Sequence, residues 1–163
     1  MMHTQRKAFS LLTAIFLILL MASVAGFVMS LSGKIVQETT SAYQKEQAAL
    51  LAKSYTELAI MTVMSNDRNG TGNCISDITG VVGAPGSSTN GEGYAVETRI
   101  AFIGPATDIG ACYGVRQLGN PVTTTADDLN IIVDIYVRYK DINSPNPATS
   151  PWVTYHRRTL QKI

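Results

Sequence analysis

The chain has 163 residues, of which 13 are Lys or Arg and 12 are Asp or Glu, so its net charge is +1. Only 15% of the residues are charged, and this near-neutral balance excludes a function that depends on strong overall attraction to a polyanion. We therefore expect no nucleic-acid partner. The most informative part of the chain is its N-terminal third, where a basic leader is followed by a long apolar run.

The apolar run, Phe9–Gly33, has no charged residue over 25 positions and follows Arg6 and Lys7. As a helix it would be about 37 Å long, which exceeds the ~30 Å hydrocarbon core of a bilayer. The basic residues before it predict a cytoplasmic N-terminus, because positive residues flank spanning helices mainly on that side. We therefore predict a transmembrane helix over residues 9–33, with the rest of the chain on the outer side.

A cleavable signal peptide is the alternative interpretation of the same run. Ser23, Val24 and Ala25 resemble a small-residue cleavage site. The apolar core of a signal peptide usually has only about 7–15 residues, whereas this run continues through Leu31. The continuation favours a retained helix.

Small residues recur along one side of the predicted membrane helix, at Ala22, Gly26, Ser30 and Gly33. Spacings of three and four place them on one helix face, where small side chains let another helix approach closely. Ala, Gly and Ser are also common in spanning helices generally. Both interpretations, a helix-packing face and ordinary composition, stay open at this point.

The helical pattern continues beyond the membrane, because Lys34–Met64 contains neither Pro nor Gly and is rich in strong helix formers. We predict a continuous helix to residue 65. Apolar residues at helical spacing form one side of it; they are Ala48, Leu51, Ala52, Tyr55, Leu58 and Ala59. The last turns are apolar on several sides, which predicts burial there; these residues are Ile60, Met61, Val63 and Met64.

The segment Lys7–Phe16 resembles the start of a type IV prepilin, in which a basic leader and a small residue precede Phe and an apolar helix. The resemblance is closer to accessory (minor) pilins of the PilX and MshP kinds. In these, a Phe-Ser-Leu start leads into a long helix with an internal Ser-Gly near its membrane exit, and Ser32 and Gly33 occupy that place here. The resemblance covers about the first 60 residues.

The resemblance implies a cut by a prepilin peptidase between Ala8 and Phe9, so that residues 1–8 are a leader and Phe9 carries an often N-methylated amino terminus. Two residues depart from the family pattern: Ala8 replaces the usual Gly, and Thr13 replaces the usual Glu. In the family that carboxylate pairs with a neighbouring subunit's terminal amine. A carboxylate in hydrocarbon is costly without a partner. Thr13 therefore favours a minor or initiating subunit.

The function implied by the resemblance is that of a structural minor pilin or pseudopilin, active in the assembly, priming or tip of a type IV pilus or a type II secretion-like filament. Its implied partners are other pilin subunits, through the N-terminal helix, together with the prepilin peptidase and an inner-membrane assembly platform. Its implied location is the bacterial inner membrane, with the C-terminal domain in the periplasm and later on a filament or the cell surface. The alternative is a non-polymerising, signal-anchored periplasmic binding or adaptor protein.

Residues 66–163 have a different composition, dense in Gly, Thr, Asn and Pro, and we expect one globular β-rich domain there. Three strands are predicted from β-branched and aromatic content, at Tyr94–Phe102, Leu129–Tyr139 and Trp152–Leu160, the last as an edge or terminal strand paired with the second. The stretch from residue 80 to 93 is predicted to be an exposed loop. The predicted fold class is α+β and pilin-like, with a small antiparallel sheet packed on the long helix.

Two details of that packing follow from the pattern. The apolar face of the second strand, which includes Val133 and Ile135, is expected to meet Leu51, Tyr55 and Leu58. Cys74 and Cys112 are the only cysteines, and an even count in an oxidising compartment predicts one disulfide. Two buried or reduced thiols are the alternative.

Three basic residues near the C-terminus, Arg157, Arg158 and Lys162, together with Lys140 suggest a small basic end of the kind that a DNA-uptake pilus would use. A solvated terminal strand explains the same residues at lower cost, and we favour it.

Residues that carry catalytic or metal chemistry do not converge. His3 lies in the leader, and His156 is interpreted as a solvated strand position. A calcium site could be suggested from Asp127, Asp128 and Asn130, but a turn before a strand explains these residues more simply. No nucleotide-binding glycine loop or nucleophile elbow is present. We therefore predict a protein that is not an enzyme and that uses no cofactor or metal.

Overall fold

The computed structural model describes residues 4–67, 72–84, 86–115 and 129–163, with side chains from residue 11 onward. The chain consists of two compact units, Met1–Thr40 and Ser41–Ile163. Helix α1 (Thr4–Ser65) supplies the described part of the first unit and the opening segment of the second. The globular unit therefore begins on the helix at Ser41, before the predicted domain start at residue 66, because helix and sheet share one core.

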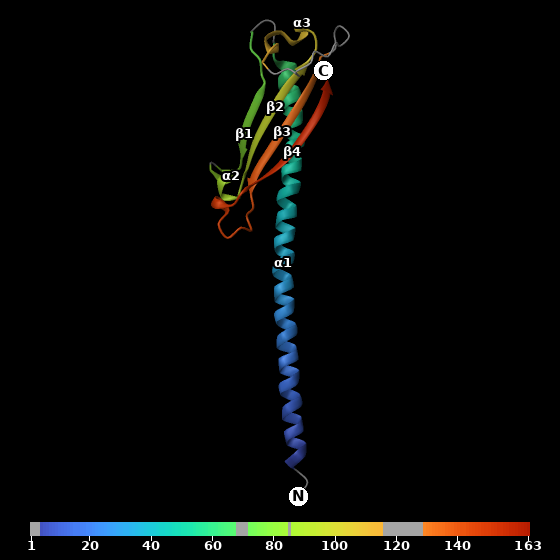
Figure 1. Cartoon of the computed structure of the whole chain (residues 1–163), viewed down its shortest axis with the longest axis vertical. Coiled ribbons are helices and arrows are strands. Elements are labelled where there is room, and N and C mark those ends of the chain that lie inside the picture. The colour runs from blue at the N-terminus through green and yellow to red at the C-terminus, as the bar shows by residue number, and fades with distance from the viewer. Residues whose placement is uncertain (1–3, 68–71, 85, 116–128) are drawn as a thin grey trace. The chain divides into compact units, whose positions relative to one another are not determined.

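The second unit contains a four-stranded antiparallel sheet beside the last turns of α1 (Figure 1). Its strands follow chain order, as β1 (Asp77–Val82), β2 (Tyr94–Ile103), β3 (Asn130–Lys140) and β4 (Trp152–Lys162). The predicted α+β arrangement, with a long N-terminal helix packed on an antiparallel sheet, is confirmed. The three predicted strands are present, and β4 is an edge strand paired with β3.

The stretch from residue 80 to 93 is not the loop that we expected. Its first residues belong to β1, and its second half forms the short helix α2 (Ser87–Asn90), in which Ser87 and Ser88 are buried. Two glycines adopt positive φ where the chain turns, Gly83 at 116° and Gly91 at 84°. Gly83 and Gly93 leave room for Ser87, whose side chain would clash with a Cβ at either position. Small residues there fold the segment back on itself.

The core of the second unit lies between β2, β3 and α1. Alternate residues of β3 face the helix and are fully buried, because successive strand side chains point to opposite faces; these are Ile131, Val133, Ile135 and Val137. Helix α1 meets them with small or medium residues at spacings of three and four, which are Gln44, Ala48, Ala52, Thr56, Ala59 and Val63. Small side chains let the helix approach the sheet closely.

The predicted contact residues on α1 are corrected in part. Leu51 and Tyr55 are half-buried against the core, but Leu58 is 44% exposed and Thr56 occupies the buried position instead. Tyr55 lies over Gly80 of β1, where an added Cβ would clash with its hydroxyl. Only glycine at that place in β1 leaves room for the tyrosine ring.

The predicted disulfide is present between Cys74 and Cys112, with Cα atoms 4.8 Å apart. It joins the segment after α1 to the turn η1 (Gly110–Cys112), which follows the short helix α3 (Ala106–Ile109). Cys112 is fully buried within the core, so the bond fixes this end of the unit covalently to its apolar interior.

The opposite end of the sheet is fixed to α1 by polar contacts. The Gln44 amide donates hydrogen bonds of 3.2 Å to the carbonyls of Gly91 and Lys140. The Tyr94 hydroxyl donates to the Gln44 carbonyl at 3.3 Å. We name this region the α1-entry end, defined by Gln44, Gly91, Lys140 and the starts of β2 and β4.

Candidate functional site

The first candidate surface is the apolar half of α1. Its large side chains from Leu11 to Val36 are exposed around the whole helix, with Leu17 57% and Met29 81% accessible. In the described part of the chain, α1 is the one helix long and apolar enough to cross a membrane. The segment therefore presents apolar surface that nothing in the first unit covers.

Three hydroxyl groups in or just after this half are turned back onto the helix. The hydroxyl of Ser23 donates to the Leu20 carbonyl at 2.8 Å, and Thr39 and Thr40 donate to the carbonyls of Ile35 and Val36 at 2.7 and 2.9 Å. Such local hydrogen bonds satisfy a hydroxyl without water. They reduce the cost of placing the helix, or its outer end, in apolar surroundings.

The predicted small-residue positions lie in the same half. Ala22, Gly26, Ser30 and Gly33 are all exposed, and a Cβ added at Gly26 or Gly33 would meet no atom within 4 Å. Ala8 and Phe9 belong to the helical backbone near the start of α1, and their side chains lie outside the described residues.

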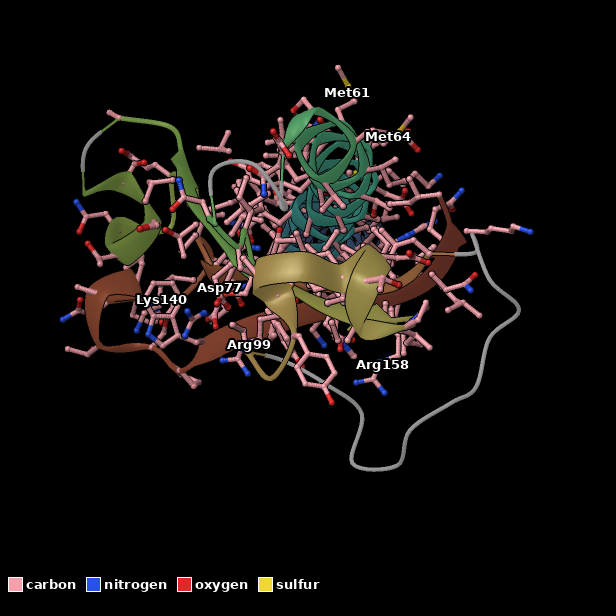
Figure 2. All side chains as sticks on the ribbon, turned by 90° about the horizontal axis from the view of Figure 1, so that it is seen from above. Met61, Met64, Asp77, Arg99, Lys140 and Arg158 are labelled. Atoms are coloured by element: carbon pink, nitrogen blue, oxygen red, sulfur yellow. A yellow bond between two sulfur atoms is a disulfide. The ribbon has the colours of Figure 1, made fainter. Side chains whose placement is uncertain are left out.

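The second candidate surface is the side of α1 that faces away from the sheet in the second unit. Five large apolar residues are exposed there, and we name them the outer α1 stripe: Tyr43, Leu50, Leu58, Met61 and Met64. Figure 2 shows Met61 and Met64 on the side of α1 opposite the sheet. The predicted burial of Met61 and Met64 is wrong, since both are 66% exposed, whereas Val63 is buried. The sheet covers only one side of the helix.

The third candidate surface is the sheet face that points away from α1, where Arg99 and Arg158 lie (Figure 2). Strand register places charged and aromatic residues side by side on it. We name it the charged sheet face, and its members are Glu97, Arg99, Asp134, Tyr136, Arg138, His156 and Arg158.

Each carboxylate on the charged sheet face is paired with arginine. Glu97 accepts hydrogen bonds from Arg99 at 2.6 Å and Arg138 at 3.0 Å. Asp134 accepts two from Arg158, at 2.7 and 2.9 Å. The Arg158 guanidinium holds the pKa of the Asp134 carboxyl below its usual value, against the opposing effect of partial burial. Both carboxylates are therefore fixed as structural ion-pair partners.

Two rings complete this face. The His156 ring stacks on Tyr136 with centroids 4.5 Å apart, and its Nε2 lies 2.9 Å from Asp134 Oδ1. The Arg99 guanidinium lies 5.2 Å from the centroid of the Tyr136 ring. His156 is thus an exposed strand position, as predicted, and it is also held between a ring and a carboxylate.

The small basic end, which was the less favoured interpretation of these residues, does not form. Arg157 pairs in register with Ile135 and so lies on the helix side of β4, whereas Arg158 pairs with Asp134 on the opposite face. Lys162 pairs with Asn130 at one end of the sheet, and Lys140 pairs with Trp152 at the other. Strand alternation and strand length separate these four cations, so they form no continuous basic patch.

Within the described ranges, no group of three or more His, Cys, Asp and Glu side chains is arranged to hold a metal ion. Asp127 and Asp128 lie outside those ranges. His156 and its neighbours have the geometry of an ion-pair network, with each carboxylate already engaged by arginine.

Comparisons with known proteins give no match. No family model, no curated protein and no solved structure matches the chain. The surfaces described above therefore carry the functional argument.

Sequence reasoning found the apolar half of α1 but missed the outer α1 stripe and the charged sheet face. The pairing of Glu97 with Arg99 had a visible signal, because residues two apart in a strand share a face. The pairing of Asp134 with Arg158 had no such signal, since it depends on the register between two strands separated by a Pro-rich connection.

Proposed function

We propose that the protein is a structural subunit of a membrane-derived filament, of the minor pilin or pseudopilin kind. In this proposal it acts in the assembly, priming or tip of a type IV pilus or a type II secretion-like filament. The observation that carries the proposal is α1 itself, which is 62 residues long and exposes large apolar side chains from Leu11 to Val36 and along the outer α1 stripe. Residues 9–33 would hold the subunit in the inner membrane with the second unit in the periplasm.

In this proposal the apolar half of α1 passes from one apolar environment, the lipid, to another, the contacts with neighbouring helices. Residues 11–36 are exposed on all sides of the helix, so in water they would carry a large hydrophobic cost. Lipid would cover them while the subunit is in the membrane, before assembly. Neighbouring helices of other subunits would cover them in a filament, where small residues such as Gly26 and Gly33 permit close approach.

The outer α1 stripe supports the same proposal in the second unit. Tyr43, Leu50 and Met61 lie on one side of the helix while the sheet occupies the other. A bundle of like helices with sheets facing outward would cover this stripe and the membrane segment together. Thr13 in place of the Glu of the resembling family favours a minor or initiating subunit within such a bundle.

The experiment is intact mass measurement of the mature protein made together with a prepilin peptidase. We expect an amino terminus at Phe9, carrying a methyl group, for the natural chain and for Ala8→Gly, which restores the residue usual at that position. Ala8→Glu is expected to block the cut and filament incorporation, because a bulky charge replaces the small residue beside the bond.

Each other result has a definite meaning. A mature start at Met1 with unaltered surface assembly would contradict the pilin proposal and favour the non-polymerising anchor. A start at Gly26 would identify a secreted protein released by signal peptidase. An Ala8→Glu protein that still starts at Phe9 would place recognition elsewhere and remove Ala8 from the processing site.

A further inference from the structure

The two edge strands of the sheet differ in how readily another strand could pair with them. Strand β1 has six residues and contains Gly80, which weakens a strand from within. Strand β4 has eleven residues, contains neither Pro nor Gly, and pairs with β3 in one unbroken register. It begins at the α1-entry end and forms the side of the sheet opposite β1 (Figure 1). Because long, regular edges are the ones that accept further strands, β4 is the open edge.

The register of β4 shows which of its backbone groups point away from the sheet. The Ile163 amide donates to the Leu129 carbonyl at 2.9 Å, so these residues form a hydrogen-bonded pair. Such pairs alternate along an antiparallel ladder, so the odd-numbered residues of β4 bond to β3 and the even-numbered residues direct N–H and C=O outward. Five of the latter are exposed and have no backbone partner in the described part of the chain; they are Trp152, Thr154, His156, Arg158 and Leu160.

The helix side of β4 adds a charge requirement to this row of backbone groups. Arg157 lies on that side, and its Nε is buried without a hydrogen-bond partner among the described residues. The neighbouring Arg158, on the opposite face, is already engaged by Asp134. A buried N–H without an acceptor carries a free-energy cost, which a carboxylate beside Arg157 would remove. An added antiparallel strand would form with Arg157 the closer, non-hydrogen-bonded kind of pair, with Cα atoms about 4.5 Å apart.

A second copy of this chain does not supply that carboxylate from either sheet edge. Strand β4 carries three cations and no Asp or Glu, so two β4 strands bring no opposite charges together in any register. On its helix side β1 carries Ile78, Gly80 and Val82, none of which is charged. The charges of β4 therefore oppose self-pairing and favour an acidic strand from a different polypeptide.

We propose that the free edge of β4 accepts an extended segment of a partner protein as a fifth, antiparallel strand, with an Asp or Glu of that segment beside Arg157. Main-chain hydrogen bonds would supply affinity and alternate side chains would supply specificity, as in other cases of strand addition. The next residues of the segment on the same face would lie beside Tyr155 and Thr159, which are half-buried. This interaction goes beyond the proposed function and does not depend on the membrane span.

The probe is a peptide that is monomeric by sedimentation, acetyl-Thr-Val-Thr-Val-Thr-Glu-Thr-Val-Thr-Val-Thr-amide, in which Glu and the Val residues share one face. Matched peptides carry Gln or Lys in place of Glu. Binding to the full chain in detergent micelles is measured by calorimetry. We expect the Glu peptide to bind about tenfold more tightly than the Gln peptide, because a charge-assisted hydrogen bond is lost. The Lys peptide should bind more weakly still, because like charges then lie side by side.

Two further peptides test strand addition itself. The two Thr residues next to Glu would direct their N–H groups to β4, so N-methylation of both should abolish binding. N-methylation of the two Val residues nearest Glu, whose N–H groups would point away from β4, should leave it nearly unchanged. Amide hydrogen exchange at Thr154, His156 and Arg158 should slow when the Glu peptide binds. Exchange at Tyr155 and Arg157, whose amides already bond to β3, should change much less.

A pair of protein variants tests the charge requirement. Arg157→Gln should reduce the preference for the Glu peptide over the Gln peptide from about tenfold to about one. Arg158→Gln removes the same charge from the opposite face and should leave the preference intact. If Arg157→Gln does not fold, the peptide series on the natural chain still decides the question.

The remaining outcomes contradict the proposal. Equal binding of the Glu, Gln and Lys peptides, or equal loss of binding in both N-methylated peptides, would overturn it. Exchange at the outward amides that is already slow without peptide, and that slows further with protein concentration, would overturn it in favour of a second copy of the chain. None of these results bears on the proposed function, which is tested by the mature amino terminus.

Discussion

The two halves of α1 differ in what covers their apolar side chains. Residues 11–36 present large apolar side chains on every side, and no other element of the first unit covers them. Residues 44–63 present Ala, Thr and Val to a sheet that covers one side and leave larger apolar residues on the other. The difference teaches that the second half gains its stability within the chain, whereas the first half requires an environment that the chain does not supply.

The largest expected effect comes from one substitution made in each half. Leu17 and Leu50 are almost equally exposed, at 57% and 56%. Leu17→Lys should oppose membrane insertion by about 3 kcal/mol, because a lysine near the centre of a spanning helix carries that cost. Leu50→Lys should leave insertion intact. The measurement is flotation with vesicles and resistance to carbonate extraction. Equal behaviour of the two variants would contradict the prediction that only the first half of α1 inserts in the membrane.

A smaller effect is expected where the sheet meets the second half. Gly80→Ala should lower the free energy of unfolding by about 1–3 kcal/mol, because the new methyl group collides with the Tyr55 hydroxyl. Tyr55→Phe removes that oxygen, so the double variant should recover part of the loss. Thermal unfolding of the four proteins checks this prediction. Additive losses in the double variant would show that the close approach of Tyr55 to β1 is not the cause.

The smallest effect is expected on the sheet face that α1 does not touch. Asp134→Asn should cost about 1 kcal/mol at neutral pH, because exposed ion pairs contribute no more than that. The pKa of Asp134 is lowered in the folded protein, so its contribution is present above its unfolded pKa of about 3.9 and is lost as pH falls through the folded value.

Melting temperatures of the natural chain and Asp134→Asn from pH 7 down to pH 2 measure this contribution. The two curves should converge in acid. Glu92→Gln, which removes an exposed carboxylate away from this network, serves as the control for loss of charge alone. A difference that stayed constant to pH 2 would show that Asp134 acts through packing and not through its charge.

The sequence predicted those features whose signal lies within one segment. Alternation from Leu129 to Tyr139 located β3 and its buried face, and an even number of cysteines in a domain expected on the outer side of a membrane predicted the disulfide. The strand β1 was missed because Gly80 interrupts a short segment that lacks aromatic residues. That glycine is explained only by the position of Tyr55, which belongs to a distant part of the chain.

The surfaces were harder to predict than the fold, because the size of a side chain on α1 did not predict whether it is buried. Leu58, Met61 and Met64 are apolar but exposed, whereas Ala52 and Thr56 are buried, since a closely packed helix–sheet contact selects small residues. The charged sheet face depends on register. Arg157 and Arg158 are neighbours in sequence, yet they lie on opposite faces of β4.

If the chain is extracted by its helix, as the proposed function requires, the disulfide has a mechanical consequence. Cys74 and Cys112 are 38 residues apart, and the segment between them contains β1 and β2. Tension that arrives through the end of α1 passes from Cys74 to Cys112 through a covalent bond and bypasses this segment. At about 3.3–3.6 Å per residue, roughly 130 Å of chain is thereby withheld from extension. The first two strands can be sheared apart from their neighbours, but they cannot be drawn out into a thread.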